Sequence, residues 1–315
     1  MISRGAGREG TVANVIQQEA GGGEQKAGRG EKAESEKRDH AFAFLSGPRG
    51  VSLSLLALYF AVTLGVLATS NATRLIVIHI LLLGIVAWVI KPRSVAAAKL
   101  GDLLPLVVAP LLYAEIPSLI SAVGSIYHDA TIQQIELAVF GMQTSQRFAA
   151  AFPNVVVSEL LHAGYLAYYP AIFVPPLMLY IRGERSAYAE TVVALTATYL
   201  LCWGIFVLAP VEGPRYLWGA AVAPDGPMRR LANEVLTAGS SRGAAFPSSH
   251  MAVVTAQTMM AFRWQRSVGW VLSVISLLVG FGAVYGGFHY ATDIVAGALL
   301  GAGIAGFTLF AFSKA

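Results

Sequence analysis

The chain has 315 residues, of which 56% are hydrophobic and only 13% are charged. Soluble domains carry about 25% charged residues, so this composition excludes an ordinary soluble protein and indicates a surface that lies largely in lipid. The net charge of +4 is small and the basic residues form no block with interleaved aromatic residues, which argues against nucleic-acid binding, while the single cysteine excludes a disulfide framework.

Residues 1–46 form a polar N-terminal segment. Its charged part, 19–40, mixes both signs of charge with Gly and Ala and contains no aromatic residue. Such a sequence cannot bury enough apolar surface to offset the entropy lost on folding, which predicts a disordered tail. No short apolar core follows the first basic residues, so we do not expect a signal peptide.

Eight apolar segments follow, and each is a candidate membrane span because about 20 apolar residues cross the roughly 30 Å hydrocarbon layer. The stronger candidates lie near 51–70, 75–90, 191–210, 268–287 and 291–312, and the weaker ones near 101–120, 160–181 and 249–263. The segment 101–120 contains Asp102, Glu115 and three prolines, which predicts a broken helix. We therefore expect an all-α protein, a polytopic transmembrane helical bundle of six to eight spans, in which residues 47–99 form an N-terminal transmembrane pair.

Basic residues mark three short connections, at 91–94, 182–186 and 263–266. If the tail is cytoplasmic and all eight segments cross, these connections fall on the cytoplasmic side, as the positive-inside rule requires. We expect an integral protein of the plasma (inner) membrane with both termini cytoplasmic. The long loops 121–159 and 211–248 then lie on the outer, periplasmic face.

Residues 129–141 have apolar side chains at helical spacing within the first long loop. Ile132, Ile135, Val139 and Phe140 are expected on one side of this helix. The pattern predicts an amphipathic helix at the membrane interface, and a cap helix without lipid contact is the alternative.

Two histidine motifs stand at the starts of apolar segments on the predicted outer face. In the run HYATD, His289 and Asp293 are four residues apart, so Asp293 can accept a hydrogen bond from one ring nitrogen and leave the other as a nucleophile. In the run FPSSH, Ser248 or Ser249 can cap a helix whose free N–H groups suit a phosphate, and His250 can act as a general acid. Each motif could alternatively be a helix cap without chemistry.

Two arginines are the candidate ligands of the phosphate oxygens. Arg215 follows a Gly-Pro turn at the end of a span, and Arg242 lies a few residues before the serines. His162 and Glu159, in the run 158–170, are weaker candidates for the pocket lining. The histidines are not grouped with carboxylates at metal-ligand spacing, so we expect no metal and no other cofactor. We expect a phosphohistidine intermediate that water or an alcohol resolves, on a phospholipid or lipid phosphate substrate drawn from the membrane lipids.

These motifs resemble those of the type 2 phosphatidic acid phosphatase superfamily. FPSSH is similar to its Pro-Ser-x-His motif, and HYATDIVAG to its His-x-x-x-Asp motif. The resemblance implies that residues 100–315 are a catalytic membrane domain, with His289 as the nucleophile, Asp293 as its orienting partner, His250 as the acid, and Ser248 and Ser249 in the phosphate cradle.

Part of the superfamily pattern is missing. The lysine that stands seven residues before an Arg-Pro pair is absent, and Gly282 and Ala283 replace the Ser-Arg of the third motif. Loss of that arginine resembles the inositolphosphotransferase branch, which includes inositol phosphorylceramide synthase, and the segments 129–141 and 158–170 also resemble that branch.

Two other functions remain open from the sequence: a membrane transporter and a non-catalytic lipid-binding relative. A transporter is expected to have charged residues near span centres and paired broken helices, and these signs are weak here outside 101–120. Gly297 and Gly301 form a GxxxG-like run that allows close helix packing, either inside the bundle or at a dimer contact.

Overall fold

The computed structural model describes residues 47–219 and 222–313. The predicted disordered tail, 1–46, lies outside the described residues. The chain divides into two units, 1–47 and 48–315, and the description below concerns the second. Its regular structure is helical, as the composition predicts, and a single parallel bridge between Val211 and Ala244 is the one isolated β interaction in the described residues.

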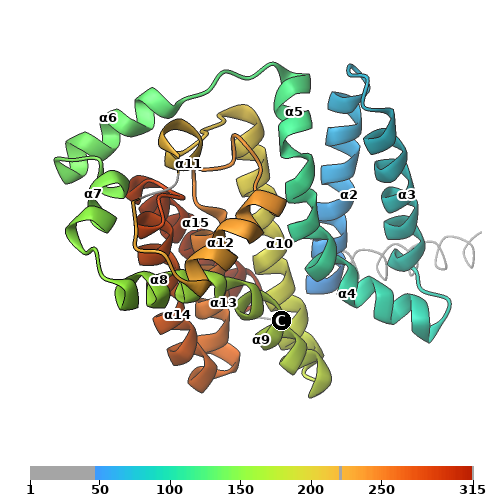
Figure 1. Ribbon diagram of the computed structural model, residues 1–315. Coiled ribbons are helices and arrows are strands. Elements are labelled where there is room, and N and C mark those ends of the chain that lie inside the picture. Colours follow the sequence, from blue (N-terminus) through green and yellow to red (C-terminus); the bar gives the residue numbers. More distant parts are fainter. Residues whose placement is uncertain (1–46, 220–221, 314–315) are drawn as a thin grey trace, which may run out of the picture. The chain divides into compact units, whose positions relative to one another are not determined.

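The helices follow one another through short connections and a few longer loops (Figure 1). In chain order they are α2 (Pro48–Leu67), α3 (Thr73–Ile90), α4 (Val95–Leu111), the 3-10 helix η1 (Leu112–Glu115), α5 (Ile116–Val123), α6 (Asp129–Phe140), α7 (Thr144–Ala151), α8 (Val155–Leu166), α9 (Tyr168–Ile181), α10 (Arg185–Leu208), α11 (Pro214–Trp218), α12 (Pro227–Gly239), α13 (Ser249–Trp264), α14 (Arg266–Tyr285) and α15 (Ala291–Ala311).

Seven stretches of helix in the described residues are long and apolar enough to cross a membrane. The protein is therefore an integral membrane protein with a polytopic helical bundle, as predicted. All eight candidate segments are helical, but α13, with 16 residues, is too short to count among the seven. At 1.5 Å per residue it extends about 24 Å, less than the hydrocarbon thickness.

The segment from α4 to α5 is broken, in agreement with its sequence. η1 interrupts it, and Glu115 at the end of η1 is buried against Tyr59, which donates a hydrogen bond, and His79, whose Nε2 lies 3.3 Å from the carboxylate. Asp102 pairs with Arg49 at 2.7 Å. Each carboxylate inside these helices thus has a polar partner, which a membrane-buried charge requires.

Helix α15 packs directly on the backbone of α13. A Cβ atom at Gly301 would overlap the carbonyl oxygen of Ala252, and one at Gly297 would overlap that of Ser248. The GxxxG-like run therefore serves packing inside the bundle, which was one of its two predicted uses. It also fixes the start of α13, where FPSSH lies, against the first two turns of α15.

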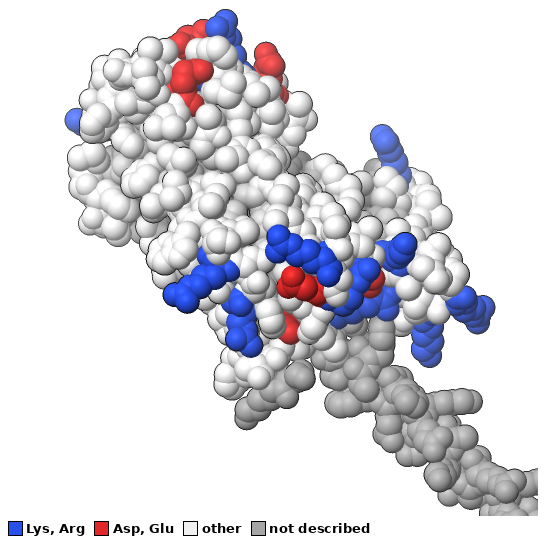
Figure 2. Space-filling view, turned by 90° about the horizontal axis from the view of Figure 1, so that it is seen from below, with Lys and Arg blue, Asp and Glu red and all other residues white. Residues whose placement is uncertain are grey.

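The basic connections and the histidine motifs lie at opposite ends of shared helices. Helix α10 begins at Arg185 and ends shortly before Arg215, and α13 begins beside His250 and ends beside Arg263. With 24 residues, α10 separates its two ends by about 36 Å. Lys and Arg side chains form a band across the face in Figure 2, with Asp and Glu among them and uncharged residues over most of the remainder.

Candidate active site

His289 and Asp293 face each other at the start of α15. Nδ1 of His289 lies 3.3 Å from Oδ2 of Asp293, and both side chains are buried. The backbone N–H of Tyr290 donates to the same oxygen at 2.9 Å, so Asp293 also caps the helix. The pairing and the capping interpretations therefore hold together. Because Nδ1 donates to the carboxylate, Nε2 of His289 carries the lone pair.

His250 stands beside His289, on the first turn of α13. Their ring centroids are 6.2 Å apart. The ring of His250 is stacked on Tyr165, whose hydroxyl lies 3.4 Å from Nε2, and it also contacts Tyr168. Nδ1 of His250 is buried and has no hydrogen-bond partner within the described residues. The two imidazoles thus lie close enough to touch the same tetrahedral group, which the sequence alone could only suggest.

The structure brings Arg215 to the histidines and holds Arg242 elsewhere. Nη2 of Arg215 donates to the Thr237 hydroxyl at 2.9 Å, while its buried Nη1 has no partner in the described part of the chain. A guanidinium nitrogen in that state is suited to an anionic oxygen. Arg242 instead donates from Nε and Nη2 to Glu212, at 2.7 and 2.6 Å, and its side chain is 60% exposed.

A small cavity of about 30 Å³ joins these residues. It is lined by both imidazoles, by Arg215 and by other residues of η1, α8, α11, α12 and the connecting loops: Tyr113, Tyr165, Glu212, Arg215, Tyr216, Leu236, Ser240, Ser241, Ala244, Ala245, His250, Phe288 and His289. Arg242 is not among them. Ser248 is fully buried and accepts a hydrogen bond from the Met251 backbone N–H at 3.4 Å, so it acts as the cap of α13.

A larger apolar groove of about 510 Å³ adjoins this cavity at His250. Aliphatic and aromatic residues from α4, η1, α9, α10 and α12 line most of it: Val107, Pro110, Leu111, Tyr113, Tyr168, Tyr169, Ile172, Phe173, Tyr199, Trp203, Val235, Leu236, Ala238, Gly239, Ser240, Ser249 and His250. Ser249, predicted as part of the phosphate cradle, thus lines the groove. A polar cavity joined to an apolar groove suits a molecule with an anionic head and a hydrocarbon tail.

His162 and Glu159 do not line the cavity. Nδ1 of His162 lies 2.6 Å from the Ser158 carbonyl oxygen, and its buried ring packs against Tyr285 and Phe288. Glu159 accepts hydrogen bonds from two backbone N–H groups at the start of α12. Both side chains are therefore engaged in contacts outside the cavity.

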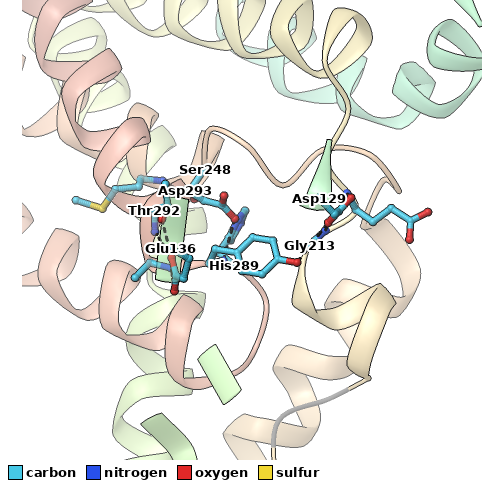
Figure 3. Close-up of polar contacts among 11 residues, drawn as sticks. Asp129, Glu136, Gly213, Ser248, His289, Thr292 and Asp293 are labelled. Atoms are coloured by element: carbon cyan, nitrogen blue, oxygen red, sulfur yellow. Dashed lines mark hydrogen bonds and ion pairs between the residues drawn. The ribbon is translucent and has the colours of Figure 1, made fainter. Parts of the chain in front are cut away.

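Sequence reasoning missed four residues at the site. Tyr113 and Tyr165 line the cavity, while Asp129 and Glu136 on α6 contact the loops that carry the motifs (Figure 3). A signal existed for Tyr165, because several tyrosines lie together in 158–170, but none existed for Tyr113, which lies in the apolar segment 101–120. The two carboxylates lie within the predicted amphipathic helix, where an inward orientation is not visible from the sequence.

A comparison with protein families matches the PAP2 superfamily over residues 131–307, more than half of the chain. The chain belongs to the PAP2 superfamily. The match contains α13, α14, most of α15 and both histidine motifs, and the predicted superfamily is confirmed. The inositolphosphotransferase branch stays a prediction.

Two curated proteins are similar to this PAP2 protein over short stretches. Undecaprenyl-diphosphatase BcrC of Bacillus subtilis (strain 168) is 39% identical over 70 residues, which are 22% of this chain and 36% of the relative. Bacitracin transport permease protein BcrC of Bacillus licheniformis is 36% identical over 56 residues, 18% of this chain and 28% of the relative. The chain thus spans about a third of the length of each relative. No solved structure matches it significantly.

The missing Ser-Arg of the PAP2 protein has a packing explanation. A Cβ at Gly282 would overlap the carbonyl oxygen of Leu161, so α14 and α8 are in close contact there. Ala283 is fully buried in an apolar cluster with Tyr165 and Phe288. An arginine at 283 would place a charge among apolar side chains, which leaves Arg215 as the cation of the cavity.

Proposed function

We propose that the protein is a lipid phosphatase or lipid headgroup phosphotransferase that works through a phosphohistidine on His289. The observation that carries this proposal is the junction of two spaces at His250: a polar cavity with two imidazoles and a guanidinium, and an apolar groove. Membership of the PAP2 superfamily supports it. A small, water-soluble phosphate ester has no hydrocarbon chain to bury in the apolar groove.

The residues of the cavity supply each step of the reaction. Nε2 of His289 attacks phosphorus, and the bond from phosphorus to the leaving oxygen breaks. Protonated His250 gives its proton to that oxygen, while Arg215 contacts the phosphoryl oxygens. In the second half, neutral His250 takes a proton from water or an alcohol, whose oxygen attacks phosphorus. The bond between nitrogen and phosphorus breaks, and its electron pair returns to His289.

The chemistry of the groove favours a substrate with one or more long hydrocarbon chains. The name of the Bacillus subtilis relative makes a polyprenyl diphosphate the first substrate to test. The resemblance of segments 129–141 and 158–170 to the inositolphosphotransferase branch adds a headgroup transfer to an acceptor alcohol as a second reaction of the same intermediate. We place the site on the outer face, because the basic connections lie at the opposite ends of α10 and α13.

The deciding experiment follows two products. The purified full-length protein is given polyprenyl diphosphate, phosphatidic acid and inositol phospholipid, with and without ceramide or diacylglycerol as the acceptor. Phosphate release without new lipid identifies a phosphatase, and a new headgroup-bearing lipid identifies a transferase. Neither product from any substrate would contradict the proposal and favour a transporter or a lipid-binding protein.

Blocking the groove should affect long-chain substrates selectively. Gly239 lines the groove, and a Cβ at this position has open space around it, so we expect the ring of Gly239→Phe to enter the groove. We expect KM for a long-chain lipid phosphate to rise about 10-fold or more, because burial of a hydrocarbon chain contributes about 0.8 kcal/mol per CH₂. Turnover of a short, water-soluble phosphate ester should be unchanged. Gly84→Phe on α3, which also meets open space, is the control, and equal losses on both substrates would refute the groove as the tail site.

The two arginines should differ sharply in their effect on activity. Arg215→Ala is expected to lower kcat/KM about 10- to 100-fold, because it removes a charge-assisted contact to the phosphoryl oxygens. Arg242→Ala is expected to change kcat/KM by no more than about twofold, because its exposed guanidinium pairs with Glu212. Steady-state kinetics on the same lipid phosphate measure both. A larger loss of kcat/KM from Arg242→Ala than from Arg215→Ala would assign the contact with the phosphoryl oxygens to Arg242 instead.

A further inference from the structure

Glu136, on α6, is a fully buried carboxylate that contacts the start of α15, next to the His289–Asp293 pair. Oε2 accepts from the backbone N–H of Thr292 at 2.8 Å and from its hydroxyl at 2.7 Å, and Oε1 accepts from the Ala291 N–H at 3.1 Å. The N–H of Thr144, at the start of α7, lies 3.3 Å from Oε1. Glu136 thus binds the free N–H groups of α15 from outside that helix, where negative charge is favoured.

Asp129 holds the turn before Arg215 in a similar way. Oδ2 accepts from the Glu212 N–H and Oδ1 from the Gly213 N–H, both at 2.9 Å. Gly213 has a φ of 85°, a conformation that residues with a side chain rarely adopt. The two hydrogen bonds to Asp129 stabilise this turn. The Tyr290 hydroxyl, next to His289 in the chain, lies 3.4 Å from Oδ1.

One helix, α6, therefore contacts both the turn before Arg215 and the start of α15 beside His289. Asp129 and Glu136 are seven residues apart, two turns of α6, and so lie on the same face of the helix. Figure 3 shows Asp129 beside Gly213 and Glu136 beside Thr292. Between them, Gln133 donates to the Tyr290 hydroxyl at 3.0 Å. Within the described residues neither carboxylate forms an ion pair, so their hydrogen bonds go to backbone and hydroxyl groups of the site loops.

We propose that Asp129 and Glu136 are positioning residues of the reaction, with separate tasks. Glu136 sets the start of α15 and with it the direction of the His289–Asp293 pair, and Asp129 sets the turn that presents Arg215. The proposal rests on the proposed function of His289 and Arg215. It is a physical consequence of bidentate, charge-assisted hydrogen bonds, which fix the geometry of the backbone they bind.

The separate tasks predict different kinetic defects. Glu136→Gln keeps the shape of the side chain but places an amide NH₂ where backbone N–H groups now donate. We expect kcat to fall about 10- to 100-fold with KM little changed, because a displacement of about 1 Å in a reacting group costs about 100-fold. Asp129→Asn should mainly raise KM, about 10-fold, because Arg215 contacts the phosphoryl group in the bound substrate as well as in the transition state.

The test combines kinetics with binding of inorganic phosphate and a stability measurement. Wild type, Glu136→Gln, Asp129→Asn and the control Glu234→Gln, an exposed carboxylate on α12, are purified as full-length protein. For each, kcat, KM, the inhibition constant of inorganic phosphate and the melting temperature are measured. Inorganic phosphate, which resembles the bound ground state, should inhibit Glu136→Gln as strongly as wild type and Asp129→Asn about 10-fold more weakly. Melting temperatures should stay within a few degrees of the control.

A double substitution examines the contact itself. Thr292→Val removes the hydroxyl that donates to Glu136 and leaves the backbone N–H donor in place. If Glu136 acts through α15, Glu136→Gln should cost less in the Thr292→Val protein than in wild type, because the two share one contact. Fully additive losses would contradict this route.

The outcomes separate this proposal from the proposed function. Wild type without activity on any lipid phosphate would defeat both. Active wild type together with inactive His289→Ala, but with both carboxylate variants equal to Glu234→Gln, would defeat the positioning proposal alone. A fall in kcat and a rise in KM by the same factor in both variants, together with a large fall in melting temperature, would show that the two carboxylates only stabilise the fold. That result would also overturn the positioning proposal.

Discussion

Replacing His289 by alanine is expected to abolish turnover, with a loss of at least about 10⁴-fold on every lipid phosphate that the wild type accepts. In the proposed mechanism, Nε2 of the imidazole supplies the electron pair for the bond to phosphorus. Among the described residues that line the cavity, no other nucleophile is oriented by a buried carboxylate as His289 is by Asp293. The methyl group of alanine fits within the space of the ring, so the helix start should be preserved.

The proposed covalent intermediate gives this prediction a second readout. Wild type incubated briefly with a ³²P-labelled lipid phosphate should carry label that is stable to alkali and lost in acid, as expected of a phosphoramidate, and His289→Ala should carry none. Asp293→Asn should reduce turnover about 10⁴-fold, by analogy with the amide substitution in Ser-His-Asp triads, which sets the wrong tautomer. A labelled His289→Ala protein with normal turnover would assign the nucleophile elsewhere.

Replacing Gly301 by valine is expected to destroy the folded protein. The added Cβ would overlap the carbonyl oxygen of Ala252, a backbone atom of α13 that cannot rotate away. Ordinary overpacking costs about 1–3 kcal/mol, and a clash with the backbone exceeds this range because two helices must separate. Since α13 carries His250 and α15 carries Asp293, the separation would also disrupt the cavity.

Gly303→Val on the same helix is the matched control. A Cβ at Gly303 meets open space, and the position is exposed, so the change in helix propensity is the same while the packing clash is absent. Melting of the detergent-purified proteins and size-exclusion profiles compare the two. Equal stability of Gly301→Val and Gly303→Val would mean that α13 and α15 are not packed as closely as described.

The fold could be predicted because lipid imposes a simple rule on sequence. Apolar runs of about 20 residues have few alternatives to membrane helices, and the prolines of 101–120 indicated the break that η1 provides. The length of α13 was harder, because its 16 residues are surrounded by other helices and need not be as long or as apolar as a lipid-facing span.

The site was predictable where chemistry is local in the chain. His289 and Asp293 meet because four residues make one helical turn. The pairing of His250 with His289, and the difference between Arg215 and Arg242, depend on contacts between distant segments. Arg242 and Glu212 are 30 residues apart, and only the folded loops place them together.

The helix at 129–140 shows why amphipathic patterns can mislead. Ile135, Val139 and Phe140 are exposed, whereas Ile132, from the same predicted apolar side, is buried together with Glu136. Spacing alone does not tell which face of a helix with mixed residues is covered, because a buried carboxylate is stable only when other segments bring it donors. Those donors, in 212–213 and 291–292, lie more than 70 residues away.

The 3-10 helix η1 contacts both the first two helices and the cavity, although it lies outside the stretch that matches the family. Within four residues it directs Tyr113 to the cavity beside the two histidines and Glu115 to the first two helices, and both α4 and η1 lie before residue 131, where the family match begins. A protein shortened to the family domain would lose one wall of the groove at Val107 and Leu111 and leave His250, which lines the same groove, open from that side. The third span is thus a wall of the proposed substrate groove rather than only an anchor, and α2 and α3 contact it through Glu115.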